Sequence, residues 1–511
     1  MLIQDKEAKD SIDKETRSIC PICKKIITAR IYEENGKVMM SKTCGEHGGF
    51  KEVYWSDSEL YLRAKKYAID GAGVENPLIK GKGAEDCPMV CGLCNVHKGH
   101  TALAIVDLTN RCNQNCKICF ANANARGYVY EPSFEDVVGM MENLRALKPV
   151  PCPAIQFSGG EPTIYPGFID VLKKAKAMGF AQIQVATNGL KFMNIDFLQR
   201  CINAGLNTAY LHFDGMDPKV YEGSGGERIY DAKLKVIENC GSTTPHLSTV
   251  LVPTIVNGEN DDQIWPTIEF AFEHLNPVLG VNFQPVAFAG RIDDKERERK
   301  RFTIPDLIKR IDKDSNGVIG KNDFYSVPSM ALFSEILSLA DRTPKLTLTV
   351  HPHCGMATYI FKDGDRVVPI TDFMDVDGFL ERVKELSLKL ENSRVRKARL
   401  LTALPSLLRF VDTKNAPVKL RKILLSLILH RSKKALAELH WKALFIGSMH
   451  FQDDYNYDVE RVMRCQIHYA VPDGRIIPFC AYNAGPEFRT EVEKKFSVPL
   501  KEWREKNDQV R

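Results

Sequence analysis

The sequence predicts an α/β fold in which a parallel sheet curves into an open, partial (β/α)6 barrel. Six short apolar segments recur between residues 102 and 288, and amphipathic stretches at helical spacing separate most of them. Strands that alternate with helices form βαβ units, whose strands are parallel. We interpret these strands as apolar throughout, as expected when both faces of a sheet are covered. The predicted strands are 102–108, 154–160, 183–189, 208–215, 248–256 and 281–288.

The chain of 511 residues is too long for one compact core, so we expect several modules around the barrel. An N-terminal metal-knuckle module and a cysteine-containing segment precede the barrel, and a barrel extension, a basic helical block and a C-terminal auxiliary-cluster region follow it. The predicted boundaries of these six parts are 1–60, 61–100, 101–300, 301–393, 394–450 and 451–511.

Composition restricts the class of protein. Apolar residues make up 44% and charged residues 26% of the chain, which is typical of globular proteins. The N-terminus is charged and has no apolar core region, which argues against a secretory signal. No apolar run approaches the roughly 20 residues that span a bilayer. The 15 cysteines fall mostly in tight groups, which indicates metal sites in a reducing compartment rather than disulfides. We therefore expect a cytoplasmic metalloprotein.

Three cysteines follow the first predicted strand at the spacing Cys112-x3-Cys116-x2-Cys119. The carboxyl end of a strand is where α/β barrels place their active sites. Three thiolates leave one iron of a four-iron cube without a protein ligand, and an open metal position is what chemistry requires. The alternative is a structural cluster or zinc site with a distant fourth ligand.

Glycine-containing turns end the next two predicted strands. The second strand runs into Ser158-Gly159-Gly160-Glu161-Pro162, and the third ends at Ala186-Thr187-Asn188-Gly189. Paired glycines let a backbone approach a ligand closely and adopt positive φ angles. Because parallel strands end at one rim of the sheet, we expect both turns to lie beside the cysteine motif.

Together these motifs resemble the radical S-adenosylmethionine (SAM) superfamily. The resemblance implies that Cys112, Cys116 and Cys119 bind a [4Fe-4S] cluster whose fourth iron chelates SAM. It also implies that the cluster's electron cleaves SAM to a deoxyadenosyl radical, which abstracts hydrogen from unactivated carbon. The cofactor-binding residues implied by the resemblance are Ser158, Gly159, Gly160, Glu161 and Asn188.

The N-terminal module carries a further metal motif. Cys20-x2-Cys23 and Cys44 supply three ligands, and His47 is a candidate for the fourth in a Cys3His zinc knuckle. Alternatively, Cys87 completes a rubredoxin-like four-cysteine iron site. The spacing favours zinc, whereas the family resemblance favours mononuclear iron.

The remaining cysteines divide into two kinds. Cys87-x3-Cys91-x2-Cys94 repeats the spacing of the radical motif without a preceding strand, so we interpret it as an auxiliary [4Fe-4S] site. Three unassigned cysteines either complete that cluster or form another one: Cys354, Cys465 and Cys480. Three others lie in or beside predicted elements, where core packing is expected: Cys152, Cys201 and Cys240.

Basic charge is concentrated between residues 394 and 447, a segment that contains thirteen lysines and arginines but only two acidic residues. Leucines recur there at near-helical spacing, which fits either a core helix with a solvated basic face or a helix lying on an anionic membrane. We favour membrane docking, and we exclude nucleic acid because aromatic residues are not interleaved with the basic ones. The residues expected to dock are Arg396, Lys397, Arg399, Arg421, Lys422, Lys433 and Lys434.

Motifs along almost the whole chain, from CPIC and CGEHG to PHCG and PFC, resemble archaeal tetraether lipid synthase and its relatives. This resemblance implies C–C bond formation between isoprenoid chains of archaeal diether phospholipids, at the inner face of the membrane. It also implies a low-potential electron donor such as ferredoxin. The alternative is a radical C-methylase acting on a soluble cofactor such as a pterin, which would not need the basic block. An electron-transfer or metal-scaffold protein would not need the strand-end glycines.

Overall fold

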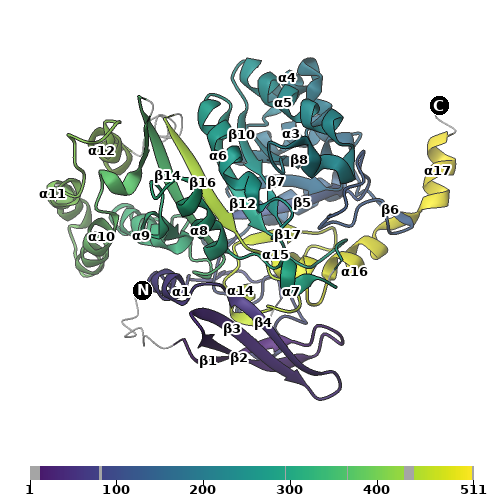
Figure 1. The fold of residues 1–511 in the computed structure, drawn as a ribbon, viewed down its shortest axis with the longest axis horizontal. Coiled ribbons are helices and arrows are strands. Elements are labelled where there is room, and N and C mark those ends of the chain that lie inside the picture. Colours follow the sequence, from purple (N-terminus) through teal and green to yellow (C-terminus); the bar gives the residue numbers. More distant parts are fainter. Residues whose placement is uncertain (1–11, 80–82, 294, 365, 431–441, 509–511) are drawn as a thin grey trace.

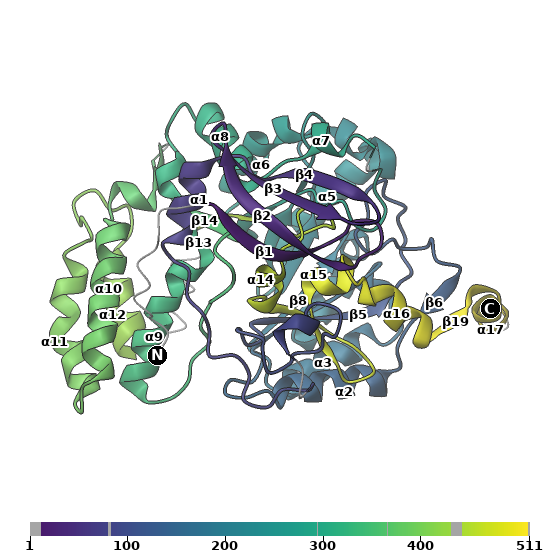
Figure 2. The same cartoon turned by 90° about the horizontal axis from the view of Figure 1, so that it is seen from below.

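The computed structural model describes residues 12–79, 83–293, 295–364, 366–430 and 442–508 (Figure 1). The chain begins with a four-stranded antiparallel sheet in the order β1-β2-β3-β4. This sheet lies below the main sheet in Figure 1 and in front of it in Figure 2. Its strands are β1 (Lys14–Ile19), β2 (Ile26–Glu34), β3 (Lys37–Cys44) and β4 (Gly48–Trp55).

Eight consecutive strands of the main sheet run parallel, in the order β16-β12-β10-β9-β8-β7-β5-β17. All six predicted strands are present in this series, and β16 and β17 join it from the C-terminal part of the chain. The strands are β5 (Leu103–Thr109), β7 (Ala154–Gly159), β8 (Gln182–Thr187), β9 (Thr208–His212), β10 (Ser248–Val252), β12 (Val278–Pro285), β16 (Ala443–Met449) and β17 (Ile467–Ala470).

Antiparallel strands extend the sheet at both ends, and within the described residues its edge strands β13 and β18 do not pair, so the barrel stays open. At one end β14 pairs with β16, and at the other β18 pairs with β17. A separate pair, β6 and β19, joins an early segment to the C-terminus. The remaining strands are β6 (Tyr128–Tyr130), β11 (Thr254–Ile255), β13 (Tyr325–Ser326), β14 (Gly355–Asp363), β15 (Arg366–Pro369), β18 (Ile476–Pro478) and β19 (Ser497–Pro499).

Amphipathic helices connect the parallel strands and cover one face of the sheet (Figure 1). The first of them, α2, begins with a capping box between Ser133 and Asp136, which satisfies two free backbone N–H groups. The helices are α1 (Ser58–Lys65), α2 (Phe134–Arg145), α3 (Phe168–Ala177), α4 (Ile195–Ala204), α5 (Glu227–Ser242), α6 (Ile264–Glu273), α7 (Arg297–Lys300), α8 (Ile304–Asp314), α9 (Ala331–Asp341), α10 (Val376–Glu391), α11 (Arg396–Leu408), α12 (Leu420–His430), α14 (Val459–Met463), α15 (Phe479–Asn483), α16 (Phe488–Lys495) and α17 (Leu500–Asp508).

The two faces of the parallel sheet differ in polarity. Side chains alternate between the faces of a strand, and strand pairing keeps each row on one side. The outer face, which α2–α6 cover, carries fully buried apolar residues from the main core: Val106, Phe157, Val185, Leu211, Leu251 and Phe283. The interpretation of the strands as apolar throughout is therefore correct only for this face. The opposite, inner face carries Gln156, Gln184, Tyr210, Asn282 and Gln284.

Two helices of the basic block, α11 and α12, belong to a helical lobe formed by α9–α12, at the left of Figure 1. Leu400, Leu404 and Leu407 of α11 are buried in one cluster with the apolar face of α10. Arg396 and Arg399 donate hydrogen bonds to carbonyl groups in the last turn of α10. Basic side chains commonly satisfy the free carbonyls of a helix end in this way. The leucines are thus covered by protein, and the prediction of membrane docking is wrong. Lys433 and Lys434 lie outside the described residues.

Within the ranges that the structure describes, no helix is long and apolar enough to cross a membrane.

The three cysteines assigned to core packing, Cys152, Cys201 and Cys240, are each 0% exposed, which confirms that prediction. Their side chains therefore contribute apolar volume to the core.

A buried ion pair ties the N-terminal sheet to the rest of the molecule. The Arg301 guanidinium lies 2.6 Å from Asp453 Oδ2 and 3.1 Å from Glu52 Oε2. Although burial alone would raise the pKa of Asp453, the charge of Arg301 lowers it to about 2. The Arg301 side chain, from the segment before α8, thus joins β4 to the segment after β16.

We predict that Asp453→Asn destabilises the protein by about 3–5 kcal/mol, because removing one partner leaves a buried charge incompletely compensated. A drop in the apparent thermal midpoint, measured by circular dichroism, would show this effect. The matched control is Asp170→Asn in the exposed Lys173–Asp170 pair, where we expect a change within about 0.5 kcal/mol. Equal midpoints for both variants would contradict the prediction.

Candidate functional site

The radical motif lies in the loop that leaves the sheet at the carboxyl end of β5. Cys112, Cys116 and Cys119 are half-buried there. The Cys112 N–H donates to Asn124 Oδ1 at 3.0 Å, and Asn124 Nδ2 donates to the Cys112 carbonyl at 2.9 Å. Cys119 and Arg291 exchange two backbone hydrogen bonds of 3.0 and 2.9 Å. The cysteine loop is therefore anchored both to itself and to the segment that follows β12.

Two glycines let the end of β7 pack directly on this loop. A Cβ on Gly159 would lie 2.2 Å from the Thr109 carbonyl oxygen, and one on Gly160 would lie 2.2 Å from the Arg111 carbonyl oxygen. Gly160 and Glu161 donate backbone hydrogen bonds of 2.7 and 2.9 Å to the same two carbonyls. Gly159 also has a φ angle of +127°, which side-chain-bearing residues rarely adopt. The close approach that we expected at these glycines therefore occurs between the end of β7 and the backbone that carries the cysteines.

Glu161 links the ends of β7 and β8. Its side chain is 0% exposed, and its Oε1 accepts from the Thr163 hydroxyl at 2.5 Å and the Thr187 hydroxyl at 2.7 Å. Its Oε2 accepts from the Asn188 N–H at 2.8 Å. Protein donors therefore occupy both carboxylate oxygens, and this side chain positions the rim.

Asn188 brings the end of β8 against the radical motif. Its Nδ2 donates to Asn113 Oδ1 at 2.7 Å and lies 3.9 Å from Cys112 Sγ. Ser158 lies one strand away, paired in register with Asp107 of β5. The structure thus brings the cofactor-binding candidates of β7 and β8 to the same rim as the cysteines.

Three ionisable residues at this rim were not among the predicted site residues. His212 Nε2 lies 2.9 Å from Asp214 Oδ2 at the end of β9. Burial alone would raise the pKa of Asp214, but the charge and hydrogen bond of His212 lower it overall. Lys233 of α5 is 1% exposed and donates to the Asn188 carbonyl at 2.6 Å. Burial lowers its pKa to about 8, against the opposing charges of Asp214 and Cys116. Sequence reasoning could have found Lys233, because it is a lysine among the apolar positions of a helix.

The thiols at the rim suit a metal cluster. Burial raises the pKa of Cys112 to about 12 and that of Cys116 to about 11, and the other cysteines of the motif add to both shifts. Such thiols ionise only when a cation compensates the thiolate charge, as coordinated iron does. The three cysteines and the neutral amide of Asn188 thus fit a [4Fe-4S] cluster with one open iron.

The N-terminal sheet holds a compact metal site. His47 Nδ1 lies 3.7 Å from Cys20 Sγ and 3.5 Å from Cys44 Sγ, and Cys23 Sγ lies 3.9 Å from Cys44 Sγ. Tetrahedral zinc with Zn–S bonds of about 2.3 Å sets sulfurs about 3.8 Å apart. Among the described residues, this is the only group of at least three such ligands whose ligand atoms all lie within 4.8 Å of one another. The structure therefore places His47, and not Cys87, beside the three ribbon cysteines.

The auxiliary cysteines come together from distant parts of the chain. Burial and the neighbouring thiols of Cys87, Cys94 and Cys465 raise the pKa of Cys91 well above its ordinary value. Burial has the largest effect on the pKa of Cys465 and raises it, and the nearby Cys480 raises it further. The segment before β5 and the C-terminal region thus meet at one buried site.

Cys354 lies at the edge of the auxiliary group. Arg461, only 2% exposed, donates through Nε to Cys354 Sγ at 3.3 Å and through Nη2 to the His450 carbonyl at 2.5 Å. Burial raises the pKa of Cys480 to about 11, and the positive charge of Arg461 opposes this shift. One guanidinium therefore lies near both cysteines.

Unpaired donors near these cysteines indicate that the auxiliary group accommodates more than protein. Gln452 Nε2 and the Tyr457 hydroxyl are buried and have no hydrogen-bond partner among the described residues. The Gln452 N–H donates to Cys480 Sγ at 3.5 Å, and Tyr457 lies close to Cys480 and Cys87. Buried polar groups normally find partners, and the sulfides of an iron–sulfur cluster accept such hydrogen bonds. The donor set therefore fits an auxiliary cluster.

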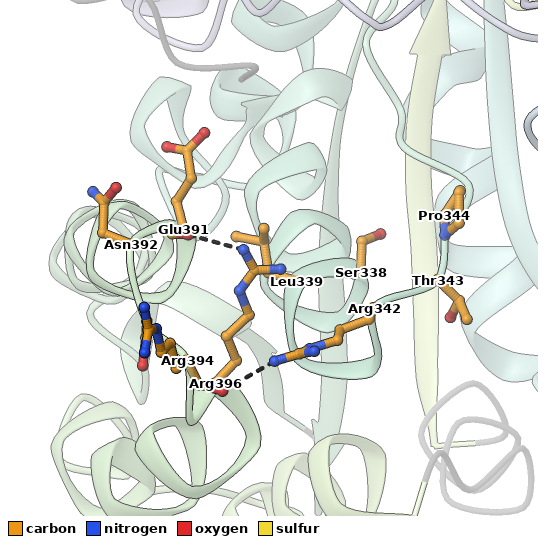
Figure 3. A pocket seen from close by; sticks show the side chains of 10 residues that line it. Ser338, Leu339, Arg342, Thr343, Pro344, Glu391, Asn392, Arg394 and Arg396 are labelled. Carbon is orange, nitrogen blue, oxygen red and sulfur yellow. Dashed lines mark hydrogen bonds between the residues drawn. The ribbon is translucent and has the colours of Figure 1, made fainter.

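A surface pocket of about 640 Å³ lies in the helical lobe, away from the rim (Figure 3). Arg342 Nη2 donates to the Arg394 carbonyl at 3.0 Å, and Arg396 Nη2 donates to the Glu391 carbonyl at 2.9 Å. These guanidinium groups stabilise the junctions between helices, and the pocket contains none of the site residues described above.

Known proteins share these features. Residues 106–271 match the radical SAM superfamily, and residues 12–56 match the HMPTM N-terminal zinc ribbon domain. A 7,8-dihydro-6-hydroxymethylpterin dimethyltransferase from Methanocaldococcus jannaschii is 49% identical over 96% of this chain and 97% of its own length. A GTP 3',8-cyclase from Chlorobaculum tepidum is 26% identical over 39% of this chain and 59% of its own. SuiB of Streptococcus suis bound to S-adenosylmethionine aligns with a TM-score of 0.34 and 15% identity, over 43% of this chain and 48% of its own.

The rim and the partial barrel define a radical SAM enzyme, whose cofactors are a [4Fe-4S] cluster and S-adenosylmethionine. Within that superfamily the chain belongs to the family of the Methanocaldococcus jannaschii dimethyltransferase. The N-terminal sheet is the zinc ribbon domain of this family. The predicted fold class and cofactors are thereby confirmed.

The predicted lipid chemistry is wrong. A relative that is 49% identical over 96% of this chain is a pterin dimethyltransferase and not a tetraether lipid synthase. The expected phospholipid substrate and peripheral membrane association are overturned with it. The physical reason for the error lies in α11 of the basic block, where Leu400, Leu404 and Leu407 pack within the helical lobe.

We predict that Cys116→Ala abolishes deoxyadenosine formation, because two thiolates cannot hold the cluster with its open iron. Anaerobic assays with dithionite, SAM and chromatographic detection of deoxyadenosine would test this. Cys201→Ala, which truncates a buried core cysteine, is the matched control and should retain cleavage. Wild-type deoxyadenosine yield from Cys116→Ala would exclude this cysteine as a cluster ligand.

We predict one tightly bound zinc per chain at the ribbon, lost in His47→Ala but retained in Cys87→Ala. His47 contacts two of the ribbon thiols, whereas Cys87 lies with the auxiliary group. Elemental analysis of anaerobically purified protein would measure zinc and iron separately. Loss of zinc from Cys87→Ala, with zinc retained in His47→Ala, would show that Cys87 and not His47 is the fourth ligand.

Proposed function

We propose that this protein is a radical SAM C-methyltransferase whose substrate is a reduced pterin, 7,8-dihydro-6-hydroxymethylpterin. The observation that carries the proposal is the 49% identity to a dimethyltransferase of that pterin over nearly the full length of both chains. Because the alignment includes the ribbon, the barrel and the C-terminal region, it spans every candidate metal site.

The polarity of the inner face supports a polar substrate. Five amide or phenol side chains line this face between β7 and β12, and three of them are less than 9% exposed. A long alkyl chain placed there would leave the free amide oxygens of Asn282 and Gln284 without hydrogen-bond donors, at a cost of about 1–3 kcal/mol each. A pterin ring carries donors and acceptors around its edge and can satisfy them. The residues are Gln156, Gln184, Tyr210, Asn282 and Gln284.

Residues at the rim have distinct roles in this proposal. Cys112, Cys116 and Cys119 hold the [4Fe-4S] cluster, and the backbone at Ser158–Gly160 together with Asn188 positions SAM. When bound, the reduced cluster and SAM supply a radical that removes hydrogen from a substrate carbon. Glu161 fixes the spacing between the ends of β7 and β8. Lys233 and Asp214 place opposite charges beside the cysteine loop.

The auxiliary site is a second proposed metal centre. Cys87, Cys91 and Cys94 supply three thiolates, and the C-terminal region offers Cys465 or Cys480 as a fourth; Cys354 lies next to them. The unpaired donors of Gln452 and Tyr457 support a cluster in this position.

We expect the reconstituted, reduced enzyme to methylate the dihydropterin in the presence of SAM and of a methanogen cell fraction that contains one-carbon donors. Mass spectrometry would detect one added methylene mass per methylation. Cys116→Ala in the same mixture is the control and should leave the pterin unchanged. Formation of deoxyadenosine with no methylated pterin under any donor condition would contradict the proposed substrate.

A further inference from the structure

Three side chains on the inner face form a hydrogen-bonded group directly below the rim. Asn282 Nδ2 donates to the Tyr210 hydroxyl, and Gln284 Nε2 donates to the same oxygen at 3.4 Å. Tyr210 lies on β9, and the two amides lie at alternate positions of β12. Three side chains from two strands thus converge on one phenol oxygen; we call them the amide–phenol group.

The amide–phenol group leaves three hydrogen-bonding positions free. Neither amide carbonyl oxygen has a donor among the described residues, and the Tyr210 hydroxyl accepts twice without donating to a described acceptor. A Cβ on Gly447 would lie 2.9 Å from Asn282 Oδ1, so the glycine keeps that oxygen accessible. The free positions are two acceptors and one donor.

A neighbouring amide chain on the same face is satisfied differently. Gln182 Nε2 donates to Gln184 Oε1 at 2.8 Å, and Gln184 Nε2 donates to Gln156 Oε1 at 2.5 Å. The carbonyl oxygens of Gln184 and Gln156 therefore each have a protein donor. The contrast shows that amides on this face can pair with one another, and that those of the amide–phenol group do not use their oxygens in this way.

The group lies next to the radical site. Tyr210 and His212 occupy alternate positions of β9 and therefore share the inner face. His212 pairs with Asp214, whose charge reaches Cys116. A ring held by the amide–phenol group would therefore lie between the floor of the barrel and the cysteine loop.

We propose that the amide–phenol group recognises the pyrimidinone edge of the pterin. That edge presents the 2-amino group and N3–H as donors and O4 as an acceptor. Asn282 Oδ1 and Gln284 Oε1 accept from the two donors, and the Tyr210 hydroxyl donates to O4. This inference rests on the proposed pterin substrate and adds the residues that select it.

The test compares two probes and two variants. The probes are 7,8-dihydro-6-hydroxymethylpterin and the analogue in which oxygen replaces the 2-amino group, bound in the presence of SAM and followed by their fluorescence. Wild-type protein should prefer the pterin at least tenfold, because a carbonyl facing a buried acceptor leaves both unpaired. Gln284→Met should weaken pterin binding about tenfold and remove most of the preference. Tyr210→Phe should weaken both probes equally, because both retain O4.

Gln182→Met is the matched control, since Gln182 is an exposed glutamine at the amino end of β8, away from the rim. It should bind both probes as the wild type does. Iron content and SAM binding report folding of each variant, and Tyr210→Phe keeps the packing of the ring if Gln284→Met does not fold.

The outcomes separate the inference from the proposed function. If wild-type protein methylates the pterin while Gln284→Met and Tyr210→Phe bind both probes unchanged, the inference is overturned and the function stands. A uniform loss of affinity in Gln284→Met, with the preference intact, also overturns it, because a purely structural role predicts that result. If the wild type binds neither probe, both proposals fall.

Discussion

The buried carboxylate of Glu161 is the constraint on which the site depends. Its four hydrogen bonds compensate the cost of burying a charge and fix the end of β8 relative to that of β7. The adjacent glycines fix β7 to the cysteine loop at backbone contact distance. Cys112, Gly160 and Asn188 therefore form one rigid rim, although they leave different strands. Catalytic geometry requires such rigidity, because displacements near 1 Å are costly in rate.

Below this rim, the division of the sheet into an apolar outer face and a polar inner face separates stability from function. Val185 and Leu211 pack under α3–α5 and need only volume and apolarity. Gln156 and Asn282, on the other face of neighbouring strands, are buried without being apolar. Buried amides cost free energy unless they are paired. Gln156 pairs with Gln184 within the protein, whereas the amide oxygen of Asn282 has no donor among the described residues, so a ligand is its expected partner.

Sequence patterns predicted the six barrel strands and the rim cysteines, because short apolar runs and short metal spacings are local signals. The polar inner face was also visible, since Gln182 and Gln184, and Asn282 and Gln284, stand at alternate positions, but we expected the runs to be apolar throughout. The leucines of α11 could not be assigned in the same way. An amphipathic pattern shows that one face is covered and does not identify the partner. That partner is α10, whose Val383 and Leu386 form the complementary face.

The C-terminal region shows why the sequence alone could not decide which cysteines join Cys87, Cys91 and Cys94. β17 pairs in parallel with β5, although more than 350 residues separate them along the chain, and this pairing carries Cys465 and Cys480 to the segment before β5. Arg489 of α16 then pairs with Asp107 of β5 at 2.6 Å, inside the molecule. The rings of Phe120 and Phe479, which follow Cys119 and precede Cys480, are 5.4 Å apart. Two aromatic rings in contact thus separate the radical motif from the auxiliary cysteines, so the fold places both candidate metal centres beside the same inner face.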